Sequence, residues 1–162
     1  DELLEARSDT TVLLHPLADT RRVLPLERCG ELLHAHADFQ LVVSYNPGYQ
    51  GLHKSLKPST RQRFVALGFD HPEPSLEAAI VAQEGGVDEA LALRLVQLAV
   101  RTRRMTDAGL NEGASTRMLV HAALLVRAGL THQAAALQAV ADPLSDEADA
   151  LAALHGLVRA SF

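Results

Sequence analysis

The sequence has little of what disulfide-bonded, zinc-binding or membrane proteins need. Cys29 is its only cysteine, which excludes an internal disulfide and a zinc site built from several thiolates. The longest apolar stretches, such as residues 118–126, are too short to cross a bilayer, and His121 interrupts this one. The first residues are acidic, and no apolar signal core with a small-residue cleavage site follows them. These absences predict a cytoplasmic chain without a membrane span.

Several catalytic patterns are also missing. The eight histidines show no HExxH spacing, and no serine lies in a nucleophile-elbow context, so we expect neither a zinc protease nor a serine hydrolase. His34 and His36 with Asp38 are better interpreted as surface residues than as metal ligands, because no further ligand accompanies them.

Charge argues against a nucleic-acid-binding protein but suggests a local anion. The formal net charge is −5, whereas nucleic-acid-binding domains usually carry a net basic face. Residues 39–69 nevertheless contain no aspartate or glutamate, while Lys54, Lys57, Arg61 and Arg63 lie within them. A bound anion would explain this excess, and so would a solvated basic face.

Short β-type runs precede residue 72. They cover residues 11–15, 22–26, 39–44 and 64–69, and the first two flank a polar connection of hairpin length at residues 16–20. The third run is apolar and leads directly into Tyr45-Asn46-Pro47-Gly48, a strong turn signal. We therefore expect a buried strand that leads into a loop.

The chain is predicted to be entirely helical after Pro74. Residues 75–83 have helical spacing and stop at two glycines, Asp88 can cap a long amphipathic segment, and residues 115–128 stop at Gly129. Thr131 can cap a segment that ends before Pro143, and Ser145 can cap a final one through residue 158. Five helices without strands predict a small bundle, with a boundary between residues 1–73 and residues 74–162.

Four polar residues are candidates for chemistry. Asn46 follows the apolar run, at a strand end where open α/β sheets usually bind ligands, although a turn asparagine before a proline is equally ordinary. Arg61 and Arg63 can make planar, bidentate contacts with phosphate, or they can be solvated. Arg117 falls in the first turn of a predicted helix, where the macrodipole disfavours a cation and an anion would compensate it. A surface arginine is the alternative.

Residues 39–72 carry a resemblance to a known family. The motifs YNPGYQ at residues 45–50 and STRQRF at residues 59–64 resemble the CbbQ/NorQ (NirQ) branch of the MoxR-type AAA+ ATPases. The Asp-Glu at residues 1–2, the LLHPLADTRRVLPLER segment at residues 13–28 and GASTRMLVHAA at residues 113–123 are similar to that family as well. The implied fold class is α/β: the C-terminal part of a AAA+ core, with strands and a β-hairpin, followed by an all-α helical lid.

The resemblance also implies a role for each candidate residue. Asp1 would support Mg²⁺ through water, and Glu2 would polarise the water that attacks ATP. Asn46 would orient that water as sensor 1. Arg117 would bind nucleotide as sensor 2. Arg63, with Arg61 as a second candidate, would be an arginine finger that acts on ATP in the neighbouring subunit, in keeping with catalysis by positioning and charge stabilisation.

One family feature is missing. No GxxxxGK[ST] loop occurs in the sequence, so the phosphate cradle and its lysine are absent, and we expect this chain to be part of a longer ATPase. The acidic start would then be the end of the Walker B motif, although a frayed acidic terminus explains those two residues as simply.

The implied function is a cytoplasmic, hexameric remodelling motor that uses ATP and Mg²⁺. Its implied partner carries a von Willebrand factor A domain, of the CbbO/NorD type, and its client enzyme is Rubisco or nitric oxide reductase. We prefer Rubisco, although no residue decides between them. The alternative from another class is a helical adaptor without catalytic activity.

Overall fold

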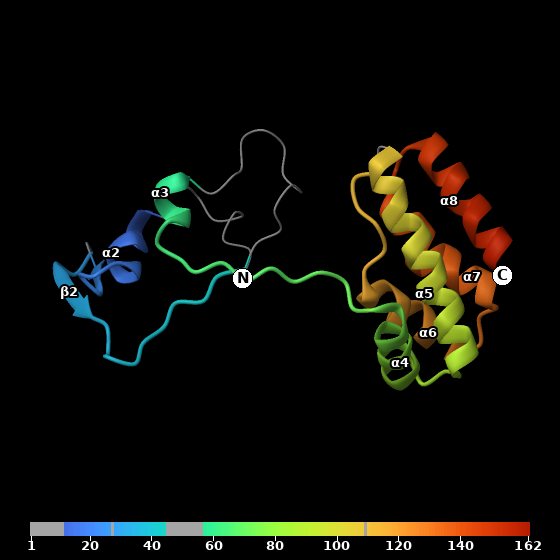
Figure 1. Ribbon diagram of the computed structural model, residues 1–162, viewed down its shortest axis with the longest axis horizontal. Coiled ribbons are helices and arrows are strands. Elements are labelled where there is room, and N and C mark those ends of the chain that lie inside the picture. The colour runs from blue at the N-terminus through green and yellow to red at the C-terminus, as the bar shows by residue number, and fades with distance from the viewer. Residues whose placement is uncertain (1–11, 27, 45–56, 109) are drawn as a thin grey trace. The chain divides into compact units, whose positions relative to one another are not determined.

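The computed structural model describes residues 12–26, 28–44, 57–108 and 110–162. The chain forms two compact units, Asp1–Gly68 and Phe69–Phe162. The second unit is the helical one, drawn from green to red in Figure 1. A AAA+ core fragment with a small sheet, followed by a helical lid, is the fold class that the sequence predicts, and the structure agrees with it.

The described residues of the first unit include a β-hairpin and the short helices α2 (His15–Ala18) and α3 (Pro58–Arg61). Strands β1 (Val23–Leu26) and β2 (Glu31–His34) pair antiparallel, with Val23 opposite His34. Gly30, just before β2, has a φ of +67°, a conformation that glycine adopts without steric cost in a tight turn.

The predicted hairpin is displaced along the sequence. Of the predicted first strand at residues 11–15, the described residues 12–15 form no strand, because Val12 and Leu13 are helical and α2 starts at His15. Pro16 occupies the first turn of α2, where its fixed φ suits a helix and its missing N–H leaves nothing unsatisfied. The predicted strand at residues 22–26 does form, as β1, but its partner is the following segment, β2.

The predicted strands at residues 39–44 and 64–69 are also wrong for the structure as described. Neither segment has regular secondary structure. The side chains of Val42, Val65 and Phe69 are 83%, 92% and 92% exposed. A strand satisfies its backbone N–H and C=O groups by pairing with a neighbour, and the only sheet among the described residues is the two-stranded hairpin.

In the described residues of the second unit, every element of secondary structure is helical. These elements are α4 (Pro74–Gly85), α5 (Glu89–Arg104), the 3₁₀ helix η2 (Met105–Ala108), α6 (Thr116–Arg127), α7 (His132–Ala136), the π-helical turn η3 (Leu137–Ala141), the 3₁₀ helix η4 (Asp142–Leu144) and α8 (Ala148–Ser161). The five predicted α-helical segments are thereby confirmed.

Helix ends follow the capping residues in most cases. Asp88 caps α5 through a 2.7 Å hydrogen bond from the Leu91 N–H to its Oδ1, and Thr131 caps α7 by accepting from the Ala134 N–H at 3.2 Å. Gly86 ends α4 in a left-handed conformation.

Two predicted helix boundaries are wrong. The segment that begins at Thr131 continues past Pro143, because a proline is tolerated in the first turn of η4.

The second wrong boundary is at the start of the last helix. Its N-cap is Glu147 rather than Ser145. The Ser145 hydroxyl instead accepts a hydrogen bond from the Glu147 N–H, at 3.1 Å. This local turn precedes α8, so the helix begins at Ala148.

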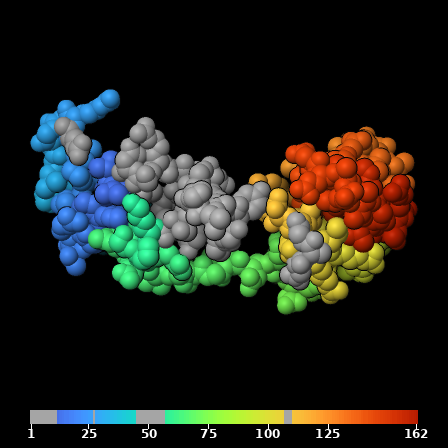
Figure 2. Space-filling view, turned by 90° about the horizontal axis from the view of Figure 1, so that it is seen from above, coloured from blue at the N-terminus to red at the C-terminus, as the bar shows by residue number. Residues whose placement is uncertain are grey.

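One hydrophobic core holds the second unit together. Helix α5 packs against α4, α6 and α8, and Figure 2 shows the helices as one continuous packed body. The largest fully buried apolar side chains are Leu95, Leu98, Leu119 and Leu154. Burial of each such side chain favours folding by roughly 1.5–3 kcal/mol. Among the described residues, no helix combines the length and apolar character that a bilayer crossing requires.

Candidate functional site

The structure describes three of the six predicted site residues. Arg61 and Arg63 belong to the first unit and Arg117 to the second. Asp1, Glu2 and Asn46 lie outside the described residues, so their predicted roles stay predictions.

Helix α3 is anchored by a buried threonine. The sequence predicts that Pro58 and Ser59 open a short helix, and the structure confirms it, with Pro58 in the first turn. Thr60 is 4% exposed, and its Oγ1 lies 2.8 Å from Nε2 of His15 in α2. This contact ties α3 to α2 and so fixes the backbone that carries Arg61 and Arg63.

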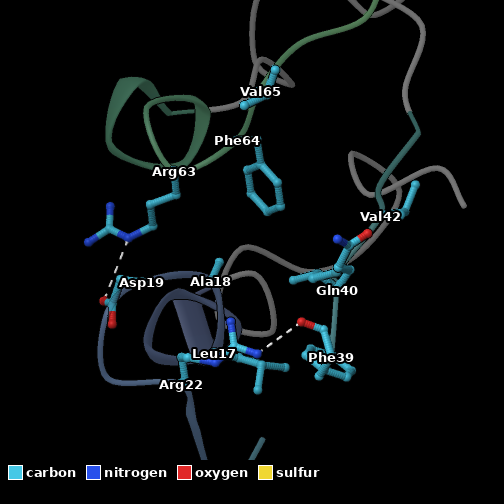
Figure 3. A pocket seen from close by; sticks show the side chains of 11 residues that line it. Leu17, Ala18, Asp19, Arg22, Phe39, Gln40, Val42, Arg63, Phe64 and Val65 are labelled. Carbon is cyan, nitrogen blue, oxygen red and sulfur yellow. Dashed lines mark hydrogen bonds and ion pairs between the residues drawn. The ribbon is translucent and has the colours of Figure 1, made fainter. Parts of the chain in front are cut away.

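The two arginines of this segment differ in their surroundings. Arg61 is exposed, whereas Arg63 is half-buried. One nitrogen of Arg63, Nη1, donates to the backbone carbonyl of Ser59. Its Nε is buried and has no hydrogen-bond partner among the described residues. Oδ2 of Asp19 lies 3.9 Å from that Nε, which is too far for a hydrogen bond (Figure 3).

Asp19 is already occupied by another arginine. The Arg21 guanidinium donates to both of its carboxylate oxygens, the shortest distance being 2.7 Å from Nη2 to Oδ2. These side-chain bonds, together with the backbone N–H of Arg21, lower the pKa of Asp19 to about 2, and the Arg63 charge contributes least. Asp19 is therefore a strong partner of Arg21 and a weak one of Arg63.

The Arg22 side chain is hydrogen-bonded to the backbone of residues 36–39. Its Nη2 donates to the carbonyl oxygens of His36, Ala37 and Phe39, at 2.8, 3.1 and 3.0 Å. Its backbone has a φ of +54°, the only positive value among described residues other than glycine. A bulky residue rarely adopts this conformation. Arg22, Arg63 and Phe64 are among the residues that line a pocket of about 410 Å³, and Figure 3 shows their side chains.

In the second unit, Arg117 is exposed in the first turn of α6. The loop before it is fixed by close packing. A Cβ on Gly113 would lie 2.5 Å from the Cα of Arg103, so only glycine fits there without movement. Both polar groups of Ala114 are hydrogen-bonded: its N–H donates to Oγ1 of Thr102 at 3.0 Å, and its C=O accepts from Nε of Arg103 at 2.9 Å.

A buried ion pair joins this loop to two helices. Glu77 in α4 has no exposed surface, and its carboxylate accepts from Nη1 and Nη2 of Arg103 in α5 at 2.8 and 2.7 Å. The Thr116 hydroxyl, on the residue before Arg117, donates to Oε1 of Glu77 at 2.7 Å. Burial raises the pKa of Glu77, but the hydrogen bonds from Arg103 and Thr116 outweigh it, so the pKa lies below its usual value.

The sequence gives no local signal for this ion pair. Glu77 lies in the first turn of one helix and Arg103 in the last turn of the next, which are ordinary places for an acid and a base near helix ends. The two residues are 26 positions apart. Only the packing of α4 against α5 brings them together.

Comparisons with known proteins match both units. The profile described as "CbbQ/NirQ/NorQ C-terminal" matches residues 77–161, which include Glu77, Arg103 and Arg117. The chain belongs to the CbbQ/NirQ/NorQ family of MoxR-type AAA+ proteins. The profile described as "AAA domain (dynein-related subfamily)" matches residues 1–64, the part of this family member that carries Arg61 and Arg63.

Individual relatives of this CbbQ/NirQ/NorQ family member align along its whole length. It is 50% identical to protein CbbQ of Hydrogenophilus thermoluteolus, 53% identical to the denitrification regulatory protein NirQ of Stutzerimonas stutzeri and 51% identical to protein NorQ of Paracoccus denitrificans. Each alignment covers 100% of the chain and 61%, 59% and 60% of the respective relative. The chain therefore spans about 60% of the length of these relatives.

The described residues offer cations for phosphate rather than ligands for a metal. No group of three or more histidine, cysteine, aspartate or glutamate side chains in the described part of the chain lies close enough to hold a metal ion. The predicted Mg²⁺ residue, Asp1, is outside that part. Arg63, whose side chain is 29% exposed, and Arg117, which is exposed, are the predicted phosphate-binding cations among the described residues.

Proposed function

We propose that the chain is part of an ATP-driven AAA+ motor that remodels and thereby activates a partner enzyme. Membership of the CbbQ/NirQ/NorQ family supports the general activity. The observation that carries the proposal is the placement of Arg63: it follows α3, which is anchored through Thr60, and its side chain is 29% exposed. An arginine that is held next to an anchored helix and is partly exposed is suited to stabilise charge on a phosphoryl group.

Each site residue has a proposed task. ATP supplies the phosphoryl group that is transferred to water, and Mg²⁺ offsets the charge of its oxygens. Glu2 polarises the attacking water, Asn46 orients it, and Asp1 supports the ion through water. Arg63 stabilises the charge that develops on the phosphoryl group in a neighbouring subunit, with Arg61 as a second candidate for this task.

Arg117 is proposed to bind the nucleotide from the lid. Its position in the first turn of α6 places a cation where the helix macrodipole is unfavourable, and a phosphate would offset that repulsion. We place the boundary between core and lid at residues 73 and 74, where α4 begins.

We further propose a cytoplasmic homohexamer that works with a partner carrying a von Willebrand factor A domain. Rubisco is the client that we propose, with inhibitory sugar phosphates released from its active sites. Nitric oxide reductase is the second candidate: relatives named denitrification regulatory protein NirQ are 53% and 56% identical to the chain, and protein CbbQ is 50% identical, so both clients are kept.

The test of the activity compares the full-length protein with the present chain. The chain has no GxxxxGK[ST] loop, so we expect residues 1–162 alone to show no turnover, because the amides and lysine that hold the β and γ phosphates are missing. The full-length protein should hydrolyse ATP. If it also lacks turnover and nucleotide binding, the chain is a helical adaptor instead.

The client is tested with purified enzymes. The full-length protein and its partner are added with ATP to Rubisco blocked by a sugar phosphate and, separately, to nitric oxide reductase that lacks a mature metal centre. Recovery of carboxylation supports the first client, and recovery of nitric oxide reduction supports the second. A variant that carries Glu2→Gln, and so cannot polarise water, is the matched negative control.

A further inference from the structure

We infer that the Glu77, Arg103 and Thr116 cluster positions Arg117, so that these three residues set how the lid distinguishes ATP from ADP. This inference rests on the proposed role of Arg117 in nucleotide binding. The three residues do not touch the nucleotide in this proposal. They act through the backbone of α6, and are therefore positioning residues.

The Glu77–Arg103 ion pair is buried, and burying its charges has a cost in free energy. Glu77 is fully buried, and the Arg103 side chain is 15% exposed. A buried ion pair stabilises a fold little more than well-packed apolar residues of the same size would, because both charges lose their hydration. Where such a pair is also bidentate and fully hydrogen-bonded, its attested use is to fix one arrangement of the elements that it joins.

The same ion pair also contacts the residues just before Arg117. Arg103 uses three donors: two bind Glu77 and the third, Nε, binds the carbonyl of Ala114. Glu77 in turn accepts from the hydroxyl of Thr116. The cluster thus holds the loop at two points, Ala114 and Thr116, which lie three residues and one residue before Arg117.

Close packing also restricts the backbone of residues 113–116. Gly113 lies against the backbone of Arg103, so the loop has no space to move inward. The Ala114 N–H is held from the other side by Thr102, whose side chain is also buried. The start of α6 is therefore fixed, while the Arg117 side chain itself is exposed and able to meet a ligand.

The experiment uses the full-length protein and measures the dissociation constants of ADP and of a slowly hydrolysed ATP analogue. Arg117→Ala should weaken binding of the analogue at least about tenfold and leave ADP nearly unchanged, because the contact to the terminal phosphate is lost. Thr116→Val removes the hydroxyl that donates to Glu77 but keeps the side-chain shape. We define the discrimination ratio as the dissociation constant of ADP divided by that of the ATP analogue. Thr116→Val should lower this ratio, as Arg117→Ala does.

Two further variants separate positioning from general stability. Thr116→Ser restores the hydroxyl and should restore the ratio. Glu77→Gln should lower the ratio, whereas Glu84→Gln, an equivalent change at an exposed position of the same helix, should not. In the double variant Thr116→Val, Arg117→Ala, the ratio should equal that of Arg117→Ala within about twofold, since residues that act as one unit are not additive.

Three outcomes would overturn the inference. If Arg117→Ala loses the discrimination but folded Thr116→Val keeps it, the cluster is only structural and the proposed function stands. If the two changes multiply in the double variant, Thr116 acts independently of Arg117. If Arg117→Ala binds both nucleotides like the wild type, the proposed role of Arg117 fails and the inference fails with it.

Discussion

At the scale of single residues, the two charged clusters of this protein behave differently. Arg63 has a fixed backbone and an unused donor, whereas Arg103 has each of its three kinds of nitrogen engaged. A guanidinium whose nitrogens are all engaged inside the protein organises structure, whereas one that is less fully engaged and 29% exposed, as in Arg63, keeps surface for a ligand. The same residue type thus has two tasks, which are distinguished by its hydrogen bonds.

Glu77→Gln should destabilise the helical unit in a pH-dependent way. The pKa of Glu77 in the folded state lies below its usual value of 4.5, so the ionised carboxylate stabilises the fold at neutral pH. This contribution is lost as the pH falls below about 4.5 and through the lower pKa of the folded state. Loss of one partner of a buried pair costs roughly 3–5 kcal/mol. The measurement is the free energy of unfolding of the wild type and of Glu77→Gln at pH 7 and at pH 3, from urea denaturation monitored through helix content.

The comparison needs a control that changes the same charge without the buried contacts. Glu84→Gln serves, because Glu84 is exposed on the same helix. We expect its free energy of unfolding to stay within about 0.5 kcal/mol of the wild type at both pH values. An equal loss for Glu77→Gln at pH 7 and at pH 3 would contradict the pH-dependent contribution.

At the scale of elements, the two faces of α5 allow a matched test of the core. Leu95 is 1% exposed and Leu93, two residues earlier, is 42% exposed. Leu95→Ala should lower the free energy of unfolding by about 2–5 kcal/mol, because it removes buried methyl groups and leaves a cavity. Leu93→Ala should cost about 1 kcal/mol or less. Chemical denaturation measures both, and similar losses would mean that Leu93 is buried in solution.

The helices could be predicted from the sequence because their signals are local. Asp88, Thr131 and the glycine pair at residues 85–86 mark helix ends through contacts within a few residues. Strands depend on partners that are distant in the chain, so alternation of side chains alone could not place residues 39–44 or 64–69 correctly. Of the candidate site, the motifs supplied the arginines. The buried Glu77 and Arg103 were missed, because only helix packing joins them.

Those two β-type segments lead to a prediction about the full-length protein. Their apolar side chains, such as Val42 and Val65, are largely exposed, which favours burial against further parts of a AAA+ core. We expect residues 40–44 and 65–69 to become paired strands there. Amide hydrogen exchange should be slow for these residues in the full-length protein and fast in the present chain. Fast exchange in both would show that they are loops.

At the scale of the whole molecule, the proposed ring makes Arg63 act in trans. Arg63→Ala in the full-length protein should lower ATP turnover by a factor on the order of 10³ while nucleotide binding stays largely intact, because the arginine contacts the phosphoryl group mainly in the transition state. Mixed rings of Arg63→Ala and Asn46→Ala subunits should recover some activity that neither variant shows alone. Steady-state turnover of verified mixed rings is the measurement.

The mixing experiment also resolves Arg61 from Arg63. Arg61→Ala serves as the comparison, since Arg61 is exposed and is the last residue of α3, two positions before Arg63. If Arg61→Ala shows the larger loss and Arg63→Ala turns over normally, Arg61 is the main finger. Absence of recovery in mixed rings would make Arg63 a residue that acts within its own subunit.

The contact between α4 and α6 bears on how the second unit can move. A Cβ on Gly85 would lie 2.3 Å from the Cβ of Ala123, so the two helices touch almost backbone to backbone. Glu77 and Thr116 join the same two helices at a second point, eight residues earlier along α4, which is about 12 Å away at the helical rise. Two fixed points prevent both sliding and pivoting. We therefore expect α4 and α6 to move together as one body, so a ligand that shifts the start of α6 would shift α4 with it.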